Sequence, residues 1–494
     1  MIVTLDGTTL SVDAVERVAH GAQVSLSAAA LEQVAQNRQA LERAIEAGAS
    51  IYGVTTGLGA LVSETVEAPG PDVQRSVLRS HAAGVGALLS EEAVRAALVV
   101  RLNCLLRGRS GIRPEVLERI ALFVNLGLTP AVPSTGSVGA SGDLAPSAHA
   151  FLPLLGEGAF LSGSAGDVLR AHGLEPLELR PKEALALING THFMAGLGSL
   201  SIARARRLAI SADAAAALTI EALRGVADAF DERIHELRPL QGQRVSAATI
   251  RVLVEGSARV GSAGRVQDAY SIRCAPQVHG AFREALAFAA SLVTVDLNAV
   301  TDNPIVFTDP LEVVSGGNFH GQSLAFAFDM LRIALADLGS ISERRTFRIV
   351  SPSLNGDLPP FLTRDPGRQS GYMLVQITAA ALLAELRALA HPVSADNVPT
   401  SDNQEDHVSM GMTGAVLTLE SVRRAETVVA IELLCATQGI ELTDGEPGPR
   451  TARVAAAVRG CVPLLTEDRP PGPDIDAVRE LVASPELARI VESR

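Results

Sequence analysis

Residues 375–392 read VQITAAALLAELRALAHP, and apolar side chains recur through this stretch at intervals of four and three residues. The pattern ends at Pro392, which disfavours helical backbone in the residue before it. This spacing places the apolar residues on one side of a long helix. Because such a stripe must be buried against neighbouring helices, the sequence predicts a helix bundle. The apolar positions are Val375, Ala379, Leu382, Leu386 and Leu389.

The same spacing recurs elsewhere in the chain. It runs over residues 286–300, and a third helix is expected between a capping Ser27 and a terminating Gly48. Strand candidates are confined to residues 1–4, and a Pro- and Gly-rich connection at 467–474 precedes a short terminal helix. We therefore expect a mainly α fold: a motif-rich N-terminal domain over 1–200 and a long-helix bundle domain over 201–494.

Composition narrows the possible partners and the compartment. Of the 494 residues, 47% are hydrophobic and 20% charged, enough to bury a large core. The formal net charge of -13, without a run of Lys and Arg, argues against nucleic acid and anionic lipid as partners. The N-terminus lacks a signal-like segment, and no apolar stretch approaches the roughly 20 residues of a membrane span. The four cysteines are far apart in sequence, so we expect reduced thiols, no metal site and a cytoplasmic protein.

The loop at 136–147 reads GSVGASGDLAPS and is the stretch most suggestive of chemistry. It has neither the GK[ST] ending of a P-loop nor the GxGxxG spacing of a dinucleotide fold. In an Ala-Ser-Gly tripeptide, the lightly covered glycine nitrogen can attack the carbonyl two residues back if the chain is sharply bent. Loss of water from that ring, and of the serine hydroxyl as a second water, would leave a methylidene-imidazolone at Ala140, Ser141 and Gly142. Asp143 and Pro146 could fix the strained geometry.

At this point the sequence resembles the aromatic amino acid ammonia-lyases and aminomutases that carry this self-made group (MIO), in particular their histidine-specific members. The resemblance covers about residues 1–480 and implies an all-helical homotetramer with active sites built from more than one subunit. It also implies a free amino acid, a small molecule, as substrate, MIO from Ala140-Ser141-Gly142, and neither a metal nor an external cofactor. The motifs are YGVTTGLG (52–59), SHAAGVG (80–86), GSVGASGDLAP (136–146), LALINGT (185–191), VQDAYSIRCAPQV (266–278), NAVTDNP (298–304), GGNFHGQ (316–322), LPPFL (358–362) and NQEDHVSM (403–410).

The resemblance also assigns roles near the electrophile. It makes Tyr52 the base that takes the substrate β-proton. Because a phenol is a weak base at neutral pH, the site would have to favour its phenolate through positive charge or helix N-termini. Asn189 and Tyr270 are expected beside the prosthetic group, and Phe319 near the substrate ring.

A second group is expected to bind the substrate carboxylate. Gln267, Tyr270 and Arg273 are spaced by three residues, so on a helix they would share one face. By resemblance Arg273 grips the carboxylate, a task that its planar guanidinium suits. Fixing the carboxylate would turn the amine toward the electrophile and the β-proton toward the base.

Three polar residues decide the expected substrate. Ser80, His81 and Glu405 offer an imidazole a hydrogen-bond partner and a carboxylate that favours its charged form. A protonated imidazole acidifies the β-proton, and a carboxylate about 4 Å away contributes roughly 4 kcal/mol at an effective dielectric of about 20. These residues favour elimination of ammonia from L-histidine to give trans-urocanate. His407 is a candidate partner of Glu405, with a structural hydrogen bond as an equal alternative.

Other positions keep alternatives open. Gly321-Gln322, Ala269 and Ala275 resemble tyrosine-specific members, while His192 replaces an expected Gln after NGT and His279 replaces an apolar residue. A tyrosine or phenylalanine ammonia-lyase, or a 2,3-aminomutase on the same scaffold, is the nearest alternative. A homologue without catalytic activity is a more distant one.

Overall fold

The structure, a computed structural model, describes residues 2–66 and 69–493. The chain forms two compact units, each described by itself below. Unit 1 comprises 1–203, 289–329 and 392–419, and unit 2 comprises 204–288, 330–391 and 420–494. The domains expected from the sequence, 1–200 and 201–494, were continuous. The structure divides the chain differently, because it returns to unit 1 twice after residue 203.

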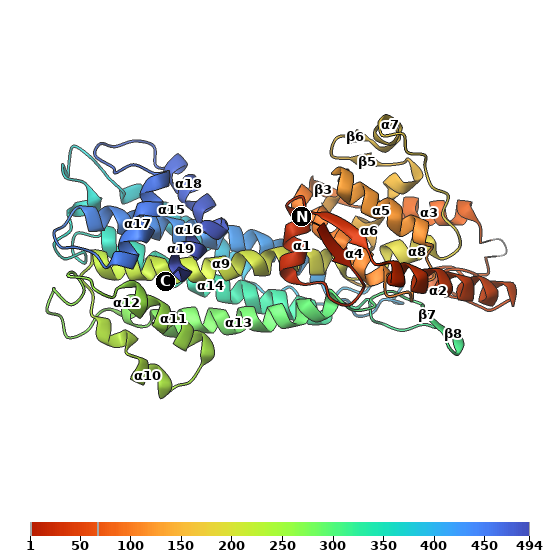
Figure 1. The fold of residues 1–494 in the computed structure, drawn as a ribbon, viewed down its shortest axis with the longest axis horizontal. Coiled ribbons are helices and arrows are strands. Elements are labelled where there is room, and N and C mark those ends of the chain that lie inside the picture. The colour runs from red at the N-terminus through yellow and green to blue at the C-terminus, as the bar shows by residue number, and fades with distance from the viewer. Residues whose placement is uncertain (1, 67–68, 494) are drawn as a thin grey trace. The chain divides into compact units, whose positions relative to one another are not determined.

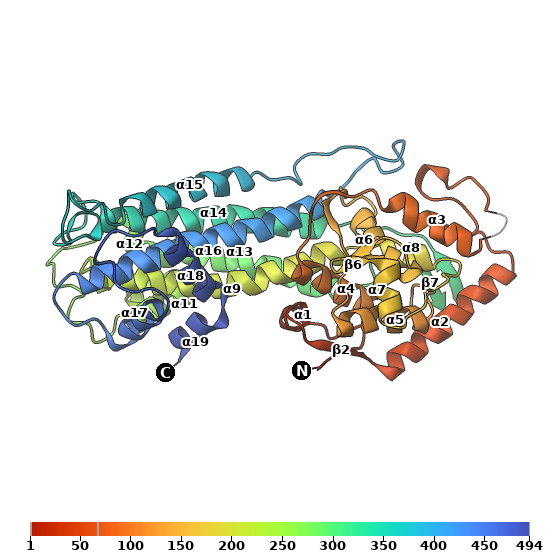
Figure 2. The same ribbon diagram turned by 90° about the horizontal axis from the view of Figure 1, so that it is seen from above.

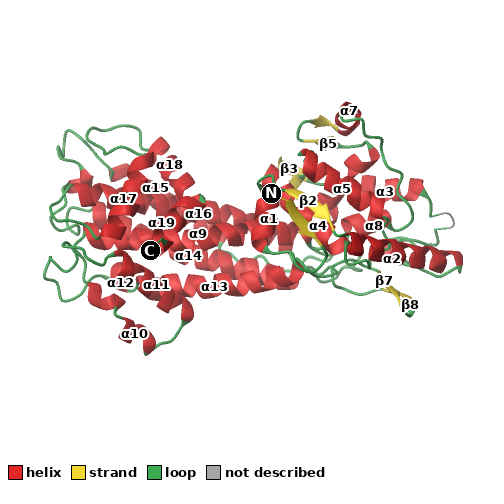
Figure 3. Cartoon of the chain, viewed as in Figure 1, coloured by secondary structure: helices red, strands yellow, loops and turns green. Residues whose placement is uncertain are grey.

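Helices predominate over short strands throughout the described residues (Figure 3), and the predicted mainly α fold is confirmed. Unit 1 contains these elements (Figure 1): β1 (Ile2–Leu5), α1 (Val12–Ala19), β2 (Gln23–Leu26), α2 (Ala28–Glu46), η1 (Gly59–Leu61), α3 (Pro71–His81), β3 (Val85–Leu88), α4 (Glu91–Leu105), α5 (Pro114–Leu126), β4 (Pro133–Thr135), α6 (Leu144–Phe151), η2 (Leu152–Leu155), β5 (Ala159–Phe160), β6 (Gly163–Ser164), α7 (Ala165–Ala171), α8 (Glu183–Ile188), β7 (Ile305–Thr308) and β8 (Leu311–Val314).

Unit 2 and the long helices make up the rest. Unit 2 contains η3 (Ala227–Phe230), α10 (Glu232–Glu236), α11 (Gln241–Leu253), α12 (Tyr270–Arg273), η4 (Pro360–Leu362), α15 (Met373–Leu389), α17 (Pro449–Cys461), α18 (Gly472–Ala483) and α19 (Pro485–Glu492). Among the described residues, four helices, labelled in Figure 2, have residues in both units: α9 (His192–Ala222), α13 (Ala275–Asp296), α14 (Gln322–Val350) and α16 (Gly411–Glu441).

The helix predictions hold where pattern and caps agree. Helix α15 ends at Leu389, and α2 begins after Ser27, whose hydroxyl accepts the Ala30 amide at 3.5 Å. Helix α13 ends at Asp296, earlier than predicted. The side-chain Nδ2 of Asn298 donates to the Thr294 carbonyl at 3.1 Å, where the helix would use the backbone amide of Asn298, which donates to Val295 instead. The sequence predicted one terminal helix, but the structure has two, α18 and α19, which are separated at Ser484.

The strands of the described residues form four two-stranded sheets, of which the sequence indicated β1 alone. Strand β1 pairs in parallel with β2, and the other three pairs are antiparallel. Each strand is two to four residues long, too short for an alternating pattern to show.

Unit 1 is organised around α4, which packs against α1 and α5. This helix is buried from Ala93 to Leu105, polar residues included. Helices α3, α6 and α8 pack together beside the loop at 136–143.

Within unit 2 the four long helices meet through buried polar groups. The Glu432 carboxylate on α16 accepts the Thr219 hydroxyl of α9 at 2.7 Å and binds Arg345 of α14 at 2.5 Å. Asp213 of α9 binds His279 Nδ1 of α13 at 2.7 Å. Arg345 also donates to His279 Nε2 at 3.3 Å, so His279 serves the packing of the bundle.

Helix α13 is long and apolar enough to cross a membrane by length and composition, so the statement that no such stretch exists was wrong. It is the one helix of this kind among the described residues, which is weak evidence, since core helices of soluble proteins meet the same criteria. Its His279 is 1% exposed and tied to Asp213 inside unit 2, as expected of a core helix.

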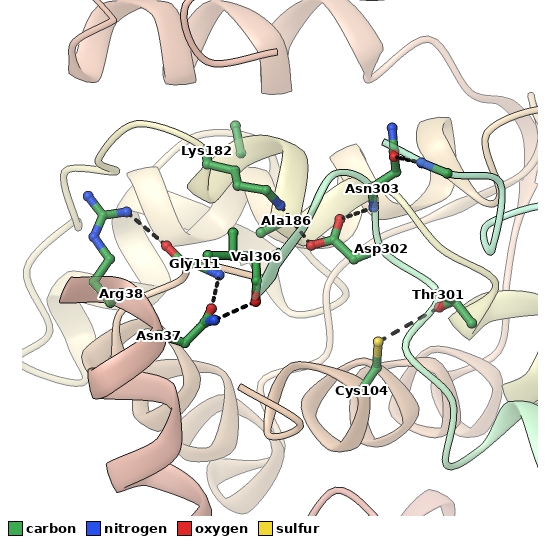
Figure 4. Close-up of polar contacts among 12 residues, drawn as sticks. Asn37, Arg38, Cys104, Gly111, Lys182, Ala186, Thr301, Asp302, Asn303 and Val306 are labelled. Carbon is green, nitrogen blue, oxygen red and sulfur yellow. Dashed lines mark hydrogen bonds and ion pairs between the residues drawn. The ribbon is translucent and has the colours of Figure 1, made fainter. Parts of the chain in front are cut away.

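Unit 1 contains a buried charge cluster around Lys182 and Asp302 (Figure 4). Lys182 and Asp302 are fully buried, and the Lys182 ammonium lies 2.8 Å from the Asp302 carboxylate. Arg101, also buried, lies 3.9 Å from Asp302 and donates to the Ala186 carbonyl. Asp302 is thus the anion between two buried cations, and burial lowers the pKa of Lys182 despite that carboxylate.

Substituting Asp302→Ala would leave both cations without this partner. We expect a loss of about 3–5 kcal/mol of unfolding free energy, the range for breaking a buried pair on one side. Urea unfolding followed by circular dichroism measures it. The control is Asp167→Ala, which removes a carboxylate from an exposed pair with Arg170 and should leave the midpoint unchanged. Equal midpoints for both variants would contradict the assigned role of Asp302.

Candidate active site

The Ala-Ser-Gly loop connects β4 to α6 and is bent sharply at two glycines. Gly139 has φ of 69° and Gly142 φ of 77°, backbone that side chains disfavour. A Cβ added to Gly142 would collide with the Gly190 carbonyl, and one added to Gly190 would collide with the end of the Arg101 side chain. Because Gly142 and Gly190 lack side chains, the tripeptide can lie against the backbone at Gly190, and Gly190 can lie against the Arg101 side chain.

Hydrogen bonds fix the backbone on both sides of the tripeptide. Asn189 Nδ2 donates to the Ser141 carbonyl at 2.9 Å, and the Ser137 hydroxyl donates to the Gly142 carbonyl at 3.1 Å. By contrast, the Ala140 carbonyl and the Gly142 amide, the groups that would join, have no hydrogen-bond partner among residues 2–66 and 69–493. The residues present fit the proposed ring. The Ser141 and Gly142 carbonyls are fixed by hydrogen bonds, while the Ala140 carbonyl and the Gly142 amide are left able to react with each other.

Asp143, directly after the tripeptide, anchors it to the start of α9. Its Oδ2 accepts the amides of Phe193 at 2.8 Å and Met194 at 3.1 Å, and its own amide donates to Gly190 at 2.8 Å. Burial raises the pKa of Asp143 to about 7, although the two amides act in the opposite direction. The suggestion that Asp143 fixes the loop agrees with these contacts.

Glu405, which the resemblance assigns to the substrate ring, lies beside the tripeptide. The Ser141 hydroxyl donates to Glu405 Oε1 at 3.1 Å, and the Thr400 hydroxyl donates to Oε2 at 2.6 Å. The same segment is tied to the loop again where Ser409 donates to the Gly139 carbonyl at 3.0 Å. A carboxylate and the serine expected to become electrophilic therefore share one site.

His407 has other partners than the one suggested for it. Its ring stacks on His320 with centroids 5.8 Å apart, and its carbonyl lies 3.2 Å from His320 Nε2. Glu405 binds Thr400 and Ser141, and among the described residues no bond joins it to His407. The pairing of Glu405 with His407 was wrong because the rings of His320 and His407 face each other.

Tyr52 is half-buried in the loop after α2. Its hydroxyl oxygen accepts the Gly59 amide at 2.9 Å, and the next amide, of Ala60, donates to Ser401 at 3.3 Å. The Gly59 N–H is the kind of donor that a phenolate oxygen needs. Tyr52 and the segment carrying Glu405 are thereby linked through neighbouring amides.

The other two substrate-ring candidates lie at the end of α3. The His81 ring nitrogen Nδ1 lies 2.8 Å from the Val77 carbonyl and 3.1 Å from the Ser80 hydroxyl. Since a carbonyl only accepts, Nδ1 carries the proton in a neutral ring, and Nε2 stays an acceptor. Within the described residues, no hydrogen bond joins either residue to Glu405. Phe319 is half-buried in the turn before α14.

Gln267, Tyr270 and Arg273 form a cluster of their own in unit 2. Arg273 donates to Gln267 Oε1 at 2.5 Å, and its guanidinium lies 4.7 Å from the Tyr270 ring centre. The expected shared helix is only partly right, because α12 begins at Tyr270 and Gln267 precedes it. Tyr270 is 71% exposed, and the buried Nε of Arg273 lacks a partner among the described residues.

Several residues of the site escaped the sequence analysis. Ser137, Thr400 and Ser409 hold the loop or Glu405 through their hydroxyls, yet a serine in a loop gives no signal beyond a turn. Ser409 lies in the NQEDHVSM motif, which was the available signal. Across the described residues, no three His, Cys, Asp or Glu side chains are grouped as a metal site.

Comparison with known proteins shows which family this chain belongs to. A family model described as aromatic amino acid lyase matches residues 10–460. The chain belongs to the aromatic amino acid lyase family. It is 48% identical to a histidine ammonia-lyase of Symbiobacterium thermophilum, over 99% of this chain and 98% of the relative. It is 47% identical to a histidine ammonia-lyase of Gloeobacter violaceus, with the same coverage.

Solved structures of the family are similar over nearly the whole chain. A tyrosine aminomutase from Streptomyces globisporus is 39% identical with a TM-score of 0.94, covering 99% of this chain and 98% of its own. A histidine ammonia-lyase from Trypanosoma cruzi is 40% identical with a TM-score of 0.92, covering 100% and 95%. Lyases and aminomutases thus share this fold.

The raised pKa of Asp143 predicts a specific pH dependence of stability. Between about pH 4 and pH 7 the folded protein keeps a proton that the unfolded chain releases, so unfolding free energy falls as pH rises through this window. Asp143→Asn keeps an acceptor for the two α9 amides and removes the titration. We expect its urea midpoint to fall less than that of the wild type between pH 5 and pH 7.5. Parallel declines would show that Asp143 does not titrate in this range.

Proposed function

We propose that this enzyme is a carbon–nitrogen lyase that eliminates ammonia from L-histidine to give trans-urocanate. The observation that carries the proposal is the Glu405 carboxylate at 3.1 Å from the Ser141 hydroxyl, which puts a negative charge where the substrate ring would lie. Relatives named histidine ammonia-lyase, at 43–48% identity over nearly the full chain, support it.

In this proposal different residues of the chain supply the electrophile, the stabilising charge and the base. The methylidene-imidazolone of Ala140, Ser141 and Gly142 supplies an electrophilic carbon for the substrate amine. Glu405 stabilises the protonated imidazole, whose charge acidifies the β-proton. Tyr52 takes that proton, with the Gly59 amide on its oxygen.

Arg273 holds the substrate carboxylate and orients the amine and β-carbon, a contribution to rate through geometry. Its unpartnered Nε and its position over Tyr270 support this assignment. We further propose that the chain acts in the cytoplasm as a homotetramer in which more than one subunit completes each site. Asn189 and Tyr270 line the electrophile, and Gln267, Ser80, His81 and Phe319 line the substrate.

An alternative is an enzyme for tyrosine or phenylalanine, either a lyase or a 2,3-aminomutase. One observation favours it: Gln322 Oε1 is buried without a partner among the described residues, at a position where the sequence resembles the tyrosine type. A 2,3-aminomutase would return the amine to the β-carbon.

Substrate turnover tests the proposal directly. We expect ultraviolet absorbance of a conjugated acid to rise with L-histidine and not with L-tyrosine or L-phenylalanine. Chromatography of the product should find urocanate and no β-amino acid. A rise with tyrosine alone, or a β-amino acid product, would replace the proposed function with the alternative.

Glu405→Gln should separate the role of the carboxylate from that of the fold. Loss of the charge should lower kcat/KM for histidine by about 100- to 1000-fold, since about 1.4 kcal/mol is worth a factor of ten. The control is Asp406→Asn at the neighbouring exposed carboxylate, which should keep kcat/KM. Steady-state kinetics measures both. An equal effect of the two variants would remove Glu405 from the mechanism.

Tyr52→Phe removes the proposed base while keeping the ring. We expect kcat to fall by about 100- to 10,000-fold, the usual contribution of a general base. Intact-mass measurement would check that the variant still carries the loss of two waters. A variant with the group intact and nearly full activity would rule out Tyr52 as the base.

A further inference from the structure

His192 is a buried histidine that the proposed reaction does not use. It is the first residue of α9, is 1% exposed, and stands where the sequence resemblance expects glutamine. Its ring lies between aromatic neighbours, with centroids 6.2 Å from Phe151 and 5.4 Å from Phe193. An apolar side chain would suit such surroundings, so the two polar nitrogens of a buried imidazole ring are unexpected at this position.

One ring nitrogen takes part in a directed chain of hydrogen bonds. His192 Nε2 lies 2.8 Å from the Ser147 hydroxyl, which lies 2.5 Å from the Asp143 carbonyl. Because the carbonyl only accepts, the single hydroxyl proton of Ser147 goes to Asp143, and His192 must donate to Ser147. The direction is therefore His192 to Ser147 to Asp143.

The other ring nitrogen shows that the ring is neutral. His192 Nδ1 is buried and has no partner among the described residues, so a proton there would lack an acceptor. Burial lowers the pKa of His192 well below its usual value, and Arg101 adds to this effect. The tautomer with its proton on Nε2 is the one that donates to Ser147.

The hydrogen-bond chain ends on the residue that follows the tripeptide. The amide of Asp143 is held by Gly190 and its carboxylate by the start of α9. The remaining polar group, the Asp143 carbonyl, accepts the Ser147 backbone amide at 3.1 Å and also the Ser147 hydroxyl, to which His192 donates. Asp143 is thus fixed at all of its backbone polar groups, and its orientation determines where the attached Gly142 lies relative to Ala140.

We propose that His192, through Ser147, is a positioning residue for ring closure at Ala140-Ser141-Gly142. The inference rests on the proposed function. In that closure a bond forms between Gly142 N and the Ala140 carbonyl carbon. The Ala140 oxygen leaves as water with the amide protons of Gly142 and Ser141. Ser141 then loses its Cα proton and its hydroxyl as a second water. His192 neither gains nor loses a proton over the sequence.

The test is the mass of the full-length chain at intervals after cell-free synthesis. His192→Phe keeps an aromatic ring and removes the donor, while His192→Gln keeps an N–H donor at similar reach. We expect the wild type and His192→Gln to lose two waters at similar rates. His192→Phe should lose them about tenfold more slowly, the effect of roughly 1.4 kcal/mol. Ser141→Ala gives the mass of an unmodified chain.

Each outcome bears on the inference. Circular dichroism and thermal melting show whether a variant is folded, and Ser147→Ala, a smaller change, gives a second reading if His192→Phe does not fold. Slow loss of water in folded His192→Phe or Ser147→Ala, with His192→Gln restored, supports the inference. Loss at the wild-type rate in a folded donor-free variant overturns it. A wild-type chain that never loses water overturns the proposed function itself.

Discussion

Asp143 carries the constraint on which the site depends. Two helix starts meet at this residue: α6 begins directly after it, and the first amides of α9 donate to its carboxylate. Amides at a helix start have no partner within the helix, so a buried start needs an acceptor from elsewhere. By supplying one, Asp143 binds the loop to a helix that begins 49 residues later in the sequence. The bend at Gly142 and the contact with Gly190 follow from that attachment.

Each of the two units also contains a buried carboxylate that is paired with buried cationic side chains. In unit 1 a carboxylate, Asp302, stands between Lys182 and Arg101, and in unit 2 Glu432 is bound by Arg345. Burying an ion costs free energy that only well-placed partners offset, so such groups tolerate few alternative packings. Apolar stripes drive the helices to associate, and the buried carboxylates of Asp302 and Glu432 each have cationic partners in the resulting arrangement.

The sequence predicted what local patterns encode. Helix α15 and the capped α2 followed from apolar spacing and from the residues at their ends, and the Ala-Ser-Gly tripeptide pointed to its own chemistry. The resemblance assigned Glu405 to the substrate ring, but its contact with Ser141 was not predicted, because 264 residues separate the two. The interleaving of the units, the attachment of Asp143 to α9 and the partners of His192 and His407 depend on contacts between distant segments, which spacing does not report.

The bond between Ser141 and Glu405 has a consequence for the order of events in the life of the enzyme. The hydroxyl that occupies Glu405 in the unmodified chain is the same hydroxyl that leaves as water when the ring forms as proposed. Before that step the Ser141 hydroxyl is a hydrogen-bond donor to Glu405, and the step would remove this donor from the carboxylate. If the substrate ring binds Glu405 as proposed, the loss of water that makes Ser141 electrophilic also frees the carboxylate for the substrate, so both requirements are met in one step.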